Sequence, residues 1–544
     1  MGSTVFGSNP SDASVPDGDT ISTSDASLAP FHQLAAVDLG SNTFRLQVGR
    51  VVDDQIYPFD SIKDTVRLAS GLTAEKRLDD AVQQRALSAL GRFGERLRGF
   101  QPESVRVVAT SALRQAKNAS DFLPRAEEVL GFPIEVIGGR EEARLTYIGA
   151  HHSLPSSEQT RLVVDIGGGS TEFIIGRKRD PLLMESLRMG CVSFTNTHFP
   201  EGRITRRGFR ESEMSAAREI ERIVGDYRRH GWGTVFGSSG TARAIAGILE
   251  ANNLNPAGVK GITRHGLEAL RDRMIRAGTP DALTLDALPA DRLPVLPGGI
   301  AIMCAVFTLM GIEQMQPARG ALRLGVLYDL LGRFHLHDMR ETTVRQFMRR
   351  YRVDTRQADR VEKTAMFLLD QLISHSHSAA HEPPEPEQHE NDRRFLRWAA
   401  KLHEIGLSIA HTGFHKHGAY ILEAADMPGF SRQEQSRLAR LILGQRGNLL
   451  RLGDMPSSSA LWHPVACLRL AALLHRSRST FPIPELQISH RGNAYRLELP
   501  RRWLQDNPLS AATLAEESLA WAQTGSHLEI VPRNSHVRNA RHDG

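Results

Sequence analysis

The fold is decided by a glycine-rich stretch at residues 162–175, which reads LVVDIGGGSTEFII. An apolar run ends at Asp165, three glycines follow, and a second apolar run begins after Glu172. This order predicts a strand, a tight turn and a second strand, because glycine adopts positive φ at the lowest cost. Consecutive glycines also let backbone N–H groups converge on an anion. The alternative is an ordinary glycine-rich hairpin that binds nothing.

Two acidic residues flank these glycines. Carboxylates beside a phosphate site make chemical sense when a hard cation lies between them, since Mg²⁺ takes one or two carboxylates together with phosphate oxygens. The sequence therefore predicts Mg²⁺ beside Asp165 and Glu172.

An earlier hairpin repeats this plan at residues 34–48, which read LAAVDLGSNTFRLQV. It again places an Asp at the end of an apolar strand, followed by glycine and a hydroxyl residue, and then a second apolar strand. Two such hairpins, each opening a strand-and-helix region, are typical of a duplicated fold that closes on phosphate from both sides.

Together, DLGSNTFRL at 38–46 and DIGGGSTEFII at 165–175 resemble the two phosphate loops of the exopolyphosphatase and guanosine pentaphosphatase family. Further stretches match this family in order, so the resemblance covers nearly everything after residue 30. It implies an α/β fold with two actin-like (ribonuclease H-like) lobes. An all-α HD-like domain and a small α+β C-terminal domain are expected to follow.

The expected domain organisation follows the changes in composition and periodicity along the chain. We expect a disordered tail at 1–30, the first lobe at 31–150, the second lobe at 151–332, the HD-like domain at 333–480, the small α+β domain at 481–535 and a frayed tail at 536–544. A polar insertion at 375–390 is expected to form a loop.

A pair of acids follows a strand and a glycine break in IGGREEAR at 137–144. Acids in the first turn of a helix also occur simply because they complement the helix dipole. The stretch resembles the family motif I-S-G-x-E-E-A-R, in which the second acid is the catalytic base; that residue is Glu142 here. Adjacent helix positions face different directions, so only one of Glu141 and Glu142 can point into the cleft.

Further phosphate contacts are implied by three other stretches. Arg67 in DTVRLA and Arg114 in ATSALR match family segments, although either could be a solvated surface arginine. GSSGT at 237–241 lies between a strand and a helix, where backbone N–H groups attract anions. GALRLGVLYD at 320–329 resembles a family segment, with Leu324 replacing an acid.

The residues expected to bind phosphate are Gly40, Ser41, Asn42, Thr43, Arg67, Arg114, Gly168, Gly169, Ser170, Thr171, Gly237, Ser238, Ser239, Gly240 and Thr241. The residues expected to hold Mg²⁺ are Asp38, Asp165 and Glu172.

The composition is that of an ordinary globular protein of several domains, with 544 residues, 40% hydrophobic and 24% charged. A net charge of +5 gives no argument for nucleic-acid binding. Three isolated cysteines indicate a reducing compartment, and we expect a cytoplasmic location without a secretory signal. We also expect no apolar run of the ~18 residues that span a membrane.

The HD-like region carries His403 followed by Glu404, where working HD domains have a His-Asp pair. The earlier segment 357–361 offers no histidine. Because a working metal site needs its full ligand set, we expect this domain to be structural.

The motifs favour an exopolyphosphatase, in which Glu142 activates water to remove terminal phosphate from inorganic polyphosphate with Mg²⁺ bound. The alternatives are a guanosine-5′-triphosphate 3′-diphosphate 5′-phosphohydrolase and a weakly hydrolysing sensor of guanosine penta- and tetraphosphate. The resemblance further implies stimulation by K⁺, a homodimer and, in some relatives, peripheral association with the inner face of the cell membrane.

Overall fold

The structure is a computed structural model that describes residues 32–52, 55–155, 157–334, 338–376, 386–452, 461–478 and 483–533. The tails predicted at 1–30 and 536–544 lie outside these residues.

The first lobe is built on a five-stranded sheet in the order β3-β2-β1-β4-β5. Strand β1 pairs antiparallel with β2 and parallel with β4. The β1 residues Ala35, Val37 and Leu39 are buried on the face of the sheet where α1 (Asp80–Arg96) and α3 (Ala119–Leu130) pack. The strands are β1 (Gln33–Leu39), β2 (Phe44–Val52), β3 (Gln55–Asp64), β4 (Val105–Ala109) and β5 (Ile134–Val136).

The second lobe repeats this topology in a six-stranded sheet, β10-β11-β9-β6-β7-β8. Here β6 takes the place of β1, since it pairs antiparallel with β7 and parallel with β9. The duplicated, two-lobed fold expected from the paired hairpins is thus confirmed. The strands are β6 (Arg161–Ile166), β7 (Thr171–Arg177), β8 (Asp180–Leu187), β9 (Thr234–Gly237), β10 (Ile262–Thr263) and β11 (Gln314–Pro317).

Five helices surround the second sheet: α5 (Cys191–His198), α6 (Arg206–His230), α7 (Gly240–Ala251), α8 (Arg264–Ala277) and α9 (Leu296–Met310). The expectation that no apolar run reaches the length of a membrane span was wrong, because 293–310 is an 18-residue helical segment of mean hydropathy 2.0. This segment is 78% buried inside the lobe, where α9 belongs to the hydrophobic core.

Two helices connect the lobes: α4 (Gly139–Ser153) and α10 (Leu322–Phe334). They approach closely at glycines, since a Cβ at Gly325 would lie only 1.7 Å from the Leu145 carbonyl oxygen. Helix α10 also packs on β1, with Val326 and Leu327 buried against Leu34. It therefore belongs to the first lobe, although its residues fall within the range predicted for the second. The short helix α2 (Ser111–Gln115) follows β4.

The helical domain and the C-terminal sheet share one hydrophobic core, in which Trp398 and Leu438 are joined by Leu497 and Trp521. The boundary predicted at 480 and 481 therefore does not separate two cores. The loop predicted at 375–390 was wrong in part, because α13 already begins at Pro386. The helices are α11 (Met339–Arg350), α12 (Thr355–Ser376), α13 (Pro386–Leu402), α14 (Phe414–Ala424), α15 (Arg432–Gly444) and α16 (Trp462–Leu474), followed by β12 (Gln487–Arg491), β13 (Ala494–Pro500), α17 (Arg501–Asp506), α18 (Pro508–Ala522) and β14 (His527–Arg533).

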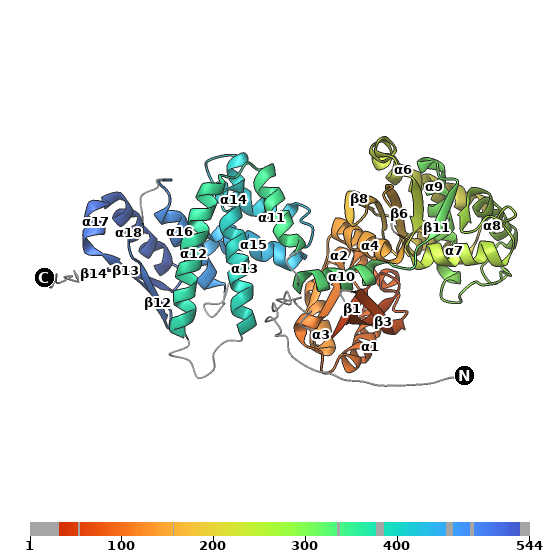
Figure 1. Cartoon of the computed structure of the whole chain (residues 1–544). Coiled ribbons are helices and arrows are strands. Elements are labelled where there is room, and N and C mark those ends of the chain that lie inside the picture. Colours follow the sequence, from red (N-terminus) through yellow and green to blue (C-terminus); the bar gives the residue numbers. More distant parts are fainter. Residues whose placement is uncertain are drawn as a thin grey trace, which may run out of the picture.

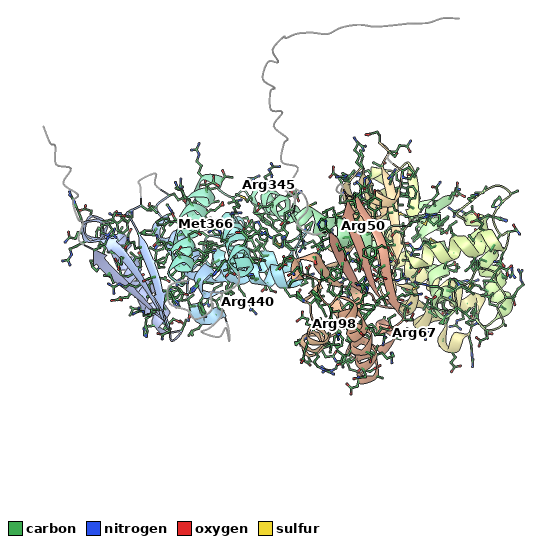
Figure 2. All side chains as sticks on the ribbon, turned by 60° about the horizontal axis from the view of Figure 1, so that its bottom comes forward. Arg50, Arg67, Arg98, Arg345, Met366 and Arg440 are labelled. Carbon is green, nitrogen blue, oxygen red and sulfur yellow. The ribbon has the colours of Figure 1, made fainter. Side chains whose placement is uncertain are left out.

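The molecule is elongated, with the two lobes at one end and the helical domain with its small sheet at the other (Figure 1). Arg50 and Arg98 lie on the lobed part and Arg345, Met366 and Arg440 on the helical part (Figure 2). The two parts touch where α15 meets β5: Gln433 Nε2 donates to the Ile134 carbonyl oxygen at 2.8 Å.

Candidate active site

A cavity of about 120 Å³ lies where the two hairpin turns face each other. The β1–β2 turn and the β6–β7 turn supply opposite walls, the start of α7 supplies a third, and α4 contributes Glu142. The predicted residues that line it are Asp38, Gly40, Ser41, Asn42, Thr43, Glu142, Asp165, Gly168, Ser170, Glu172, Ser239 and Gly240. The paired-hairpin hypothesis thus located the cavity.

Glu142 lies in the first turn of α4 and is almost completely buried at the cavity. Burial raises the pKa of its carboxyl group to about 7, helped by the charges of Asp38 and Asp165 and opposed by that of Arg114. Arg114 Nη1 lies 3.1 Å from Glu142 Oε2. A carboxylate with a pKa near neutrality is well matched to accepting a proton from water.

Glu141 points elsewhere. Its carboxylate accepts hydrogen bonds from Arg144 Nε and Nη2, both at 2.7 Å, and from the backbone N–H of Gly429 at 2.8 Å. Glu141 does not line the cavity. The geometry therefore selects Glu142 as the candidate base, as the motif predicts.

Three further carboxylates face the cavity. Burial raises the pKa of Asp38 to about 6, against the opposing charges of Arg323 and Arg45. Burial likewise raises the pKa of Asp165, whose Oδ2 accepts a hydrogen bond from Ser238 Oγ at 2.5 Å. The pKa of Glu172 is raised well above its ordinary value, because burial acts together with the charges of Glu142 and Asp165. So many buried acids repel one another unless a cation or protons neutralise them.

The donor set fits Mg²⁺ that is completed by substrate. Within the described residues, no group of three or more His, Cys, Asp or Glu side chains could hold an ion unaided. Mg²⁺ does not require such a group, since it keeps water and binds through one or two carboxylates plus phosphate. Asp38 Oδ1 is moreover buried without a hydrogen-bond partner among the described residues, as are Thr43 Oγ1 and the Asn42 side-chain amide. Unpartnered buried polar atoms are costly, so they indicate a ligand here.

Four arginines that the motif analysis missed also line the cavity: Arg45, Arg243, Arg292 and Arg323. Arg323 Nη1 lies 3.7 Å from Asp38 Oδ2. Burial and the neighbouring charges of Arg323 and Arg292 lower the pKa of Arg45 to about 10. Two of the four lie within motifs, Arg45 in DLGSNTFRL and Arg323 in GALRLGVLYD. The resemblance of these motifs indicated glycines and hydroxyl residues as ligands, but not their arginines. Arg292 belongs to no motif.

Several predicted phosphate ligands do not line the cavity: Arg67, Arg114, Gly169, Thr171, Gly237, Ser238 and Thr241. The Thr171 and Thr241 hydroxyls are committed to the carbonyl oxygens of Met189 and Ile166. Arg67 is exposed (Figure 2). Its backbone N–H, rather than its guanidinium, supports the site by donating to the Asn42 carbonyl oxygen at 2.8 Å.

The sequence matches the Ppx/GppA phosphatase family over residues 47–334 and domain III of Ppx/GppA phosphatases over residues 339–518. The chain belongs to the Ppx/GppA phosphatase family. It is therefore a hydrolase that acts on phosphoanhydride bonds.

Individual members of the Ppx/GppA family resemble the chain to different extents. A guanosine-5′-triphosphate,3′-diphosphate pyrophosphatase from Aeromonas hydrophila is 37% identical over 488 residues, which is 89% of this chain and 95% of that protein. An exopolyphosphatase structure from Cytophaga hutchinsonii covers 55% of this chain and 97% of its own, at 24% identity and a TM-score of 0.50. A Ppx/GppA enzyme structure from Aquifex aeolicus covers 54% and 98%, at 25% identity and a TM-score of 0.45.

The HD-like residues line a separate cavity of about 660 Å³ in the helical domain. His403 Nδ1 lies 2.7 Å from the Ala400 carbonyl oxygen, and Glu404 accepts from Arg478 Nη2 at 2.6 Å. Burial lowers the pKa of His403, which keeps the ring neutral. Whether this domain lacks hydrolytic activity stays a prediction.

Proposed function

We propose that this Ppx/GppA phosphatase removes the terminal phosphate from the 5′-triphosphate of guanosine-5′-triphosphate,3′-diphosphate. One observation carries this proposal: the pyrophosphatase that bears this substrate in its name is 37% identical over nearly the whole of both chains. The proposal reverses the order of substrates expected from the motifs. Inorganic polyphosphate becomes the competing substrate, because the exopolyphosphatase structure is similar to this chain only at the level of the fold.

The charge pattern of the cavity supports a polyphosphorylated substrate. Arg45, Arg243, Arg292 and Arg323 converge on one small cavity together with the two glycine turns. Guanidinium groups can each donate two hydrogen bonds to a phosphate, and these bonds are stronger than neutral ones. The mutual repulsion of these half-buried arginines is relieved when a multiply charged anion lies between them.

Hydrolysis on this site needs one protein base. Glu142 accepts a proton from water, the water oxygen forms a bond to the terminal phosphorus, and the bond from that phosphorus to the bridging oxygen breaks. The products are inorganic phosphate and the shortened anhydride chain. No covalent enzyme intermediate is required, because phosphoryl transfer depends mainly on positioning and charge neutralisation.

Asp38, Asp165 and Glu172 are the residues that would hold Mg²⁺, and it would neutralise charge on the phosphate oxygens. The unpartnered Oδ1 of Asp38 supports this assignment.

The test compares phosphate release from guanosine pentaphosphate and from long-chain polyphosphate by the purified full chain. We expect the larger kcat/KM for guanosine pentaphosphate and, for Glu142→Gln, a loss on the order of 10²–10⁴-fold. Glu211→Gln is the matched control, since this exposed carboxylate pairs with Arg207 on the surface of α6. A larger kcat/KM for polyphosphate would restore the exopolyphosphatase hypothesis, and tight binding without turnover would indicate a sensor.

A further inference from the structure

Glu141, the neighbour of the candidate base, joins the first lobe to the helical domain. Its side chain is only 3% exposed and receives the backbone N–H of Gly429 at 2.8 Å, across 288 residues of sequence. Gly429 lies in the loop between α14 and α15. One carboxylate in the first turn of α4 thus binds directly to another domain.

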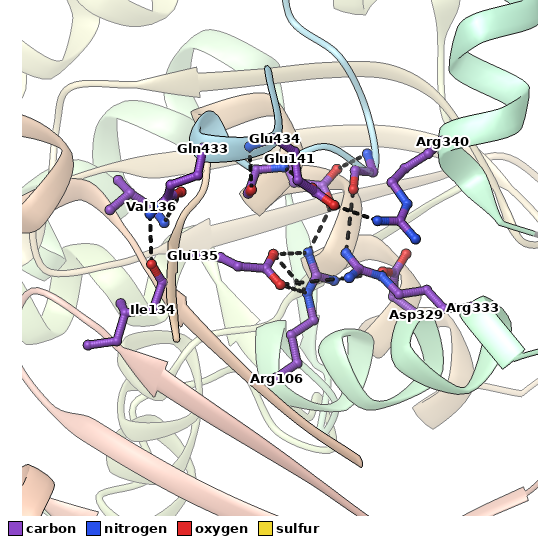
Figure 3. Close-up of polar contacts among 12 residues, drawn as sticks. Arg106, Ile134, Glu135, Val136, Glu141, Asp329, Arg333, Arg340, Gln433 and Glu434 are labelled. Carbon is purple, nitrogen blue, oxygen red and sulfur yellow. Dashed lines mark hydrogen bonds and ion pairs between the residues drawn. The ribbon is translucent and has the colours of Figure 1, made fainter. Parts of the chain in front are cut away.

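Behind Glu141 lies a buried network of ion pairs (Figure 3). Arg144 joins Glu141 to Asp329 on α10, with Nη2 at 2.5 Å from Asp329 Oδ1. Arg106 Nη1 approaches the other oxygen of Asp329 at 2.6 Å, and its Nη2 lies 2.9 Å from Glu135. Burial alone would raise the pKa of Asp329, but these arginine charges hold it below its ordinary value. Removing one member of such a network would leave a buried charge unpaired, which is costly. The network therefore holds Glu141 firmly in position.

The loop that carries Gly429 is held by the helical domain itself. Thr343 Oγ1 on α11 donates to the Pro428 carbonyl oxygen at 2.7 Å. Gly429 has a φ of +88°, and a Cβ there would lie 3.1 Å from the backbone nitrogen of Arg340. The N–H that Glu141 receives is therefore presented only while α11 and this loop are docked.

The first turn of α4 has no side-chain cap, although Arg114 contacts Glu142. Its N-cap is Gly138, which has no side chain to satisfy the free N–H groups of the helix start. Glu142 is adjacent to Glu141 and faces the cavity from the same turn.

We propose that Glu141 is a positioning residue through which docking of the helical domain places Glu142 in the cavity. The proposal rests on Glu142 as the base in the proposed function. It gives the helical domain a part in catalysis without a site of its own. When the loop at Gly429 moves away, the first turn of α4 loses its tether to the helical domain, and Glu142 is held less rigidly in the cavity.

The test uses steady-state kinetics of the full chain with whichever of the two substrates the unmodified protein hydrolyses faster. Glu141→Ala removes the contacts to Gly429 and to the arginines of the network, whereas Glu141→Gln keeps an oxygen that can accept from Gly429. We expect kcat to fall about tenfold or more for Glu141→Ala and less for Glu141→Gln, because small displacements of a catalytic group are costly. KM should change less than about twofold, because Glu141 lines no part of the cavity.

A second variant avoids the buried charges, so that poor folding of Glu141→Ala does not decide the outcome. Thr343→Val removes the bond to Pro428 from within the helical domain, and we expect a smaller fall in kcat, unchanged KM and faster amide hydrogen exchange at residues 139–143. Asp426→Asn is the matched control, since its ion pair with Arg140 at 3.4 Å crosses the same contact but is solvent-exposed.

Two results would overturn the proposal. One is wild-type kcat per folded molecule in both Thr343→Val and Glu141→Gln, and the other is a rise in KM that accounts for the loss of activity. An error in the proposed base is seen separately, because Glu142→Gln would then remain active while the Glu141 variants still report on the contact.

Discussion

Arg114 is fixed beside Glu142 by a second hydrogen bond: its Nη1 donates to the Ile137 carbonyl oxygen at 2.8 Å as well as to Glu142 Oε2 at 3.1 Å. The guanidinium was expected to grip phosphate, but it does not line the cavity. Its position suits another task, which is to favour the ionised form of the base.

The contact between Arg114 and Glu142 predicts how kcat/KM depends on pH. Arg114 lowers the pKa of Glu142, which burial raises to about 7. Activity requires ionised Glu142, so kcat/KM should rise with pH through this pKa. Arg114→Gln removes the lowering charge, and the midpoint of the rise should move to higher pH. The measurement is kcat/KM from pH 5.5 to 9, with Arg125→Gln, an exposed arginine on α3, as control. A midpoint that stays or falls would show that Arg114 does not tune the base.

The buried acids also predict how stability depends on pH. Asp38 has a pKa of about 6 in the folded chain and an ordinary value of 3.8. Because the folded state binds the proton more tightly, the stabilisation is complete below the ordinary pKa and is lost as pH rises through 6. The shift corresponds to on the order of 3 kcal/mol.

In excess chelator, the free energy of unfolding should therefore decrease between pH 4 and pH 7, and less steeply in Asp38→Asn. Urea unfolding at several pH values checks this, with the exposed Asp226→Asn as control. Equal slopes for Asp38→Asn and the unmodified chain would show that the pKa of Asp38 is not raised in the folded chain.

Removal of one cavity carboxylate should weaken the binding of Mg²⁺. Asp165→Asn should raise the Mg²⁺ concentration for half-maximal activity by about tenfold or more, since a ligand charge is lost. It should also reduce the rise in Tm that added Mg²⁺ gives. Glu250→Gln, an exposed change on α7, is the control. Full activity in excess chelator would refute the metal proposal.

The helical domain should not hydrolyse on its own account. His403 is tied to the Ala400 carbonyl oxygen, and the described residues place no metal-binding group around it. His403→Gln should therefore leave phosphate release within a few-fold of the unmodified rate, provided that the Tm shows a folded chain. A distinct phosphoester activity that disappears with His403→Gln would reverse this expectation.

The sequence predicted the parts of the fold and site whose signals are local. The turns at Gly40 and Gly168 are decided by neighbouring residues, so their hairpins and the cavity between them could be anticipated. The role of Glu141 could not, because its partner Gly429 is 288 residues away and contributes only a backbone N–H. A backbone donor leaves no trace in residue type.

Packing between segments that are distant along the chain escaped the sequence for a related reason. Helix α10 follows the second lobe along the chain but packs on the first, and Gly325 allows its close approach to α4. Likewise, 293–310 is apolar on all sides because it is buried within a lobe, and composition alone does not distinguish this from a membrane helix.

The last prediction compares an arginine that lines the cavity with one that lies outside it. Arg323 lines the cavity and lies 3.7 Å from Asp38, whereas Arg67, a motif residue, is exposed outside it. If cavity arginines bind the phosphates, Arg323→Gln should raise KM about tenfold or more, because a charge-assisted pair of hydrogen bonds is lost. Arg67→Gln should change KM less than about twofold.

The difference in KM between the two variants should persist at high salt, since buried pairs are screened far less than exposed ones. The measurement is KM for guanosine pentaphosphate at low and high ionic strength. A larger effect from Arg67→Gln would mean that substrate extends beyond the cavity along β3 and that the motif, rather than the lining, identifies the phosphate ligands.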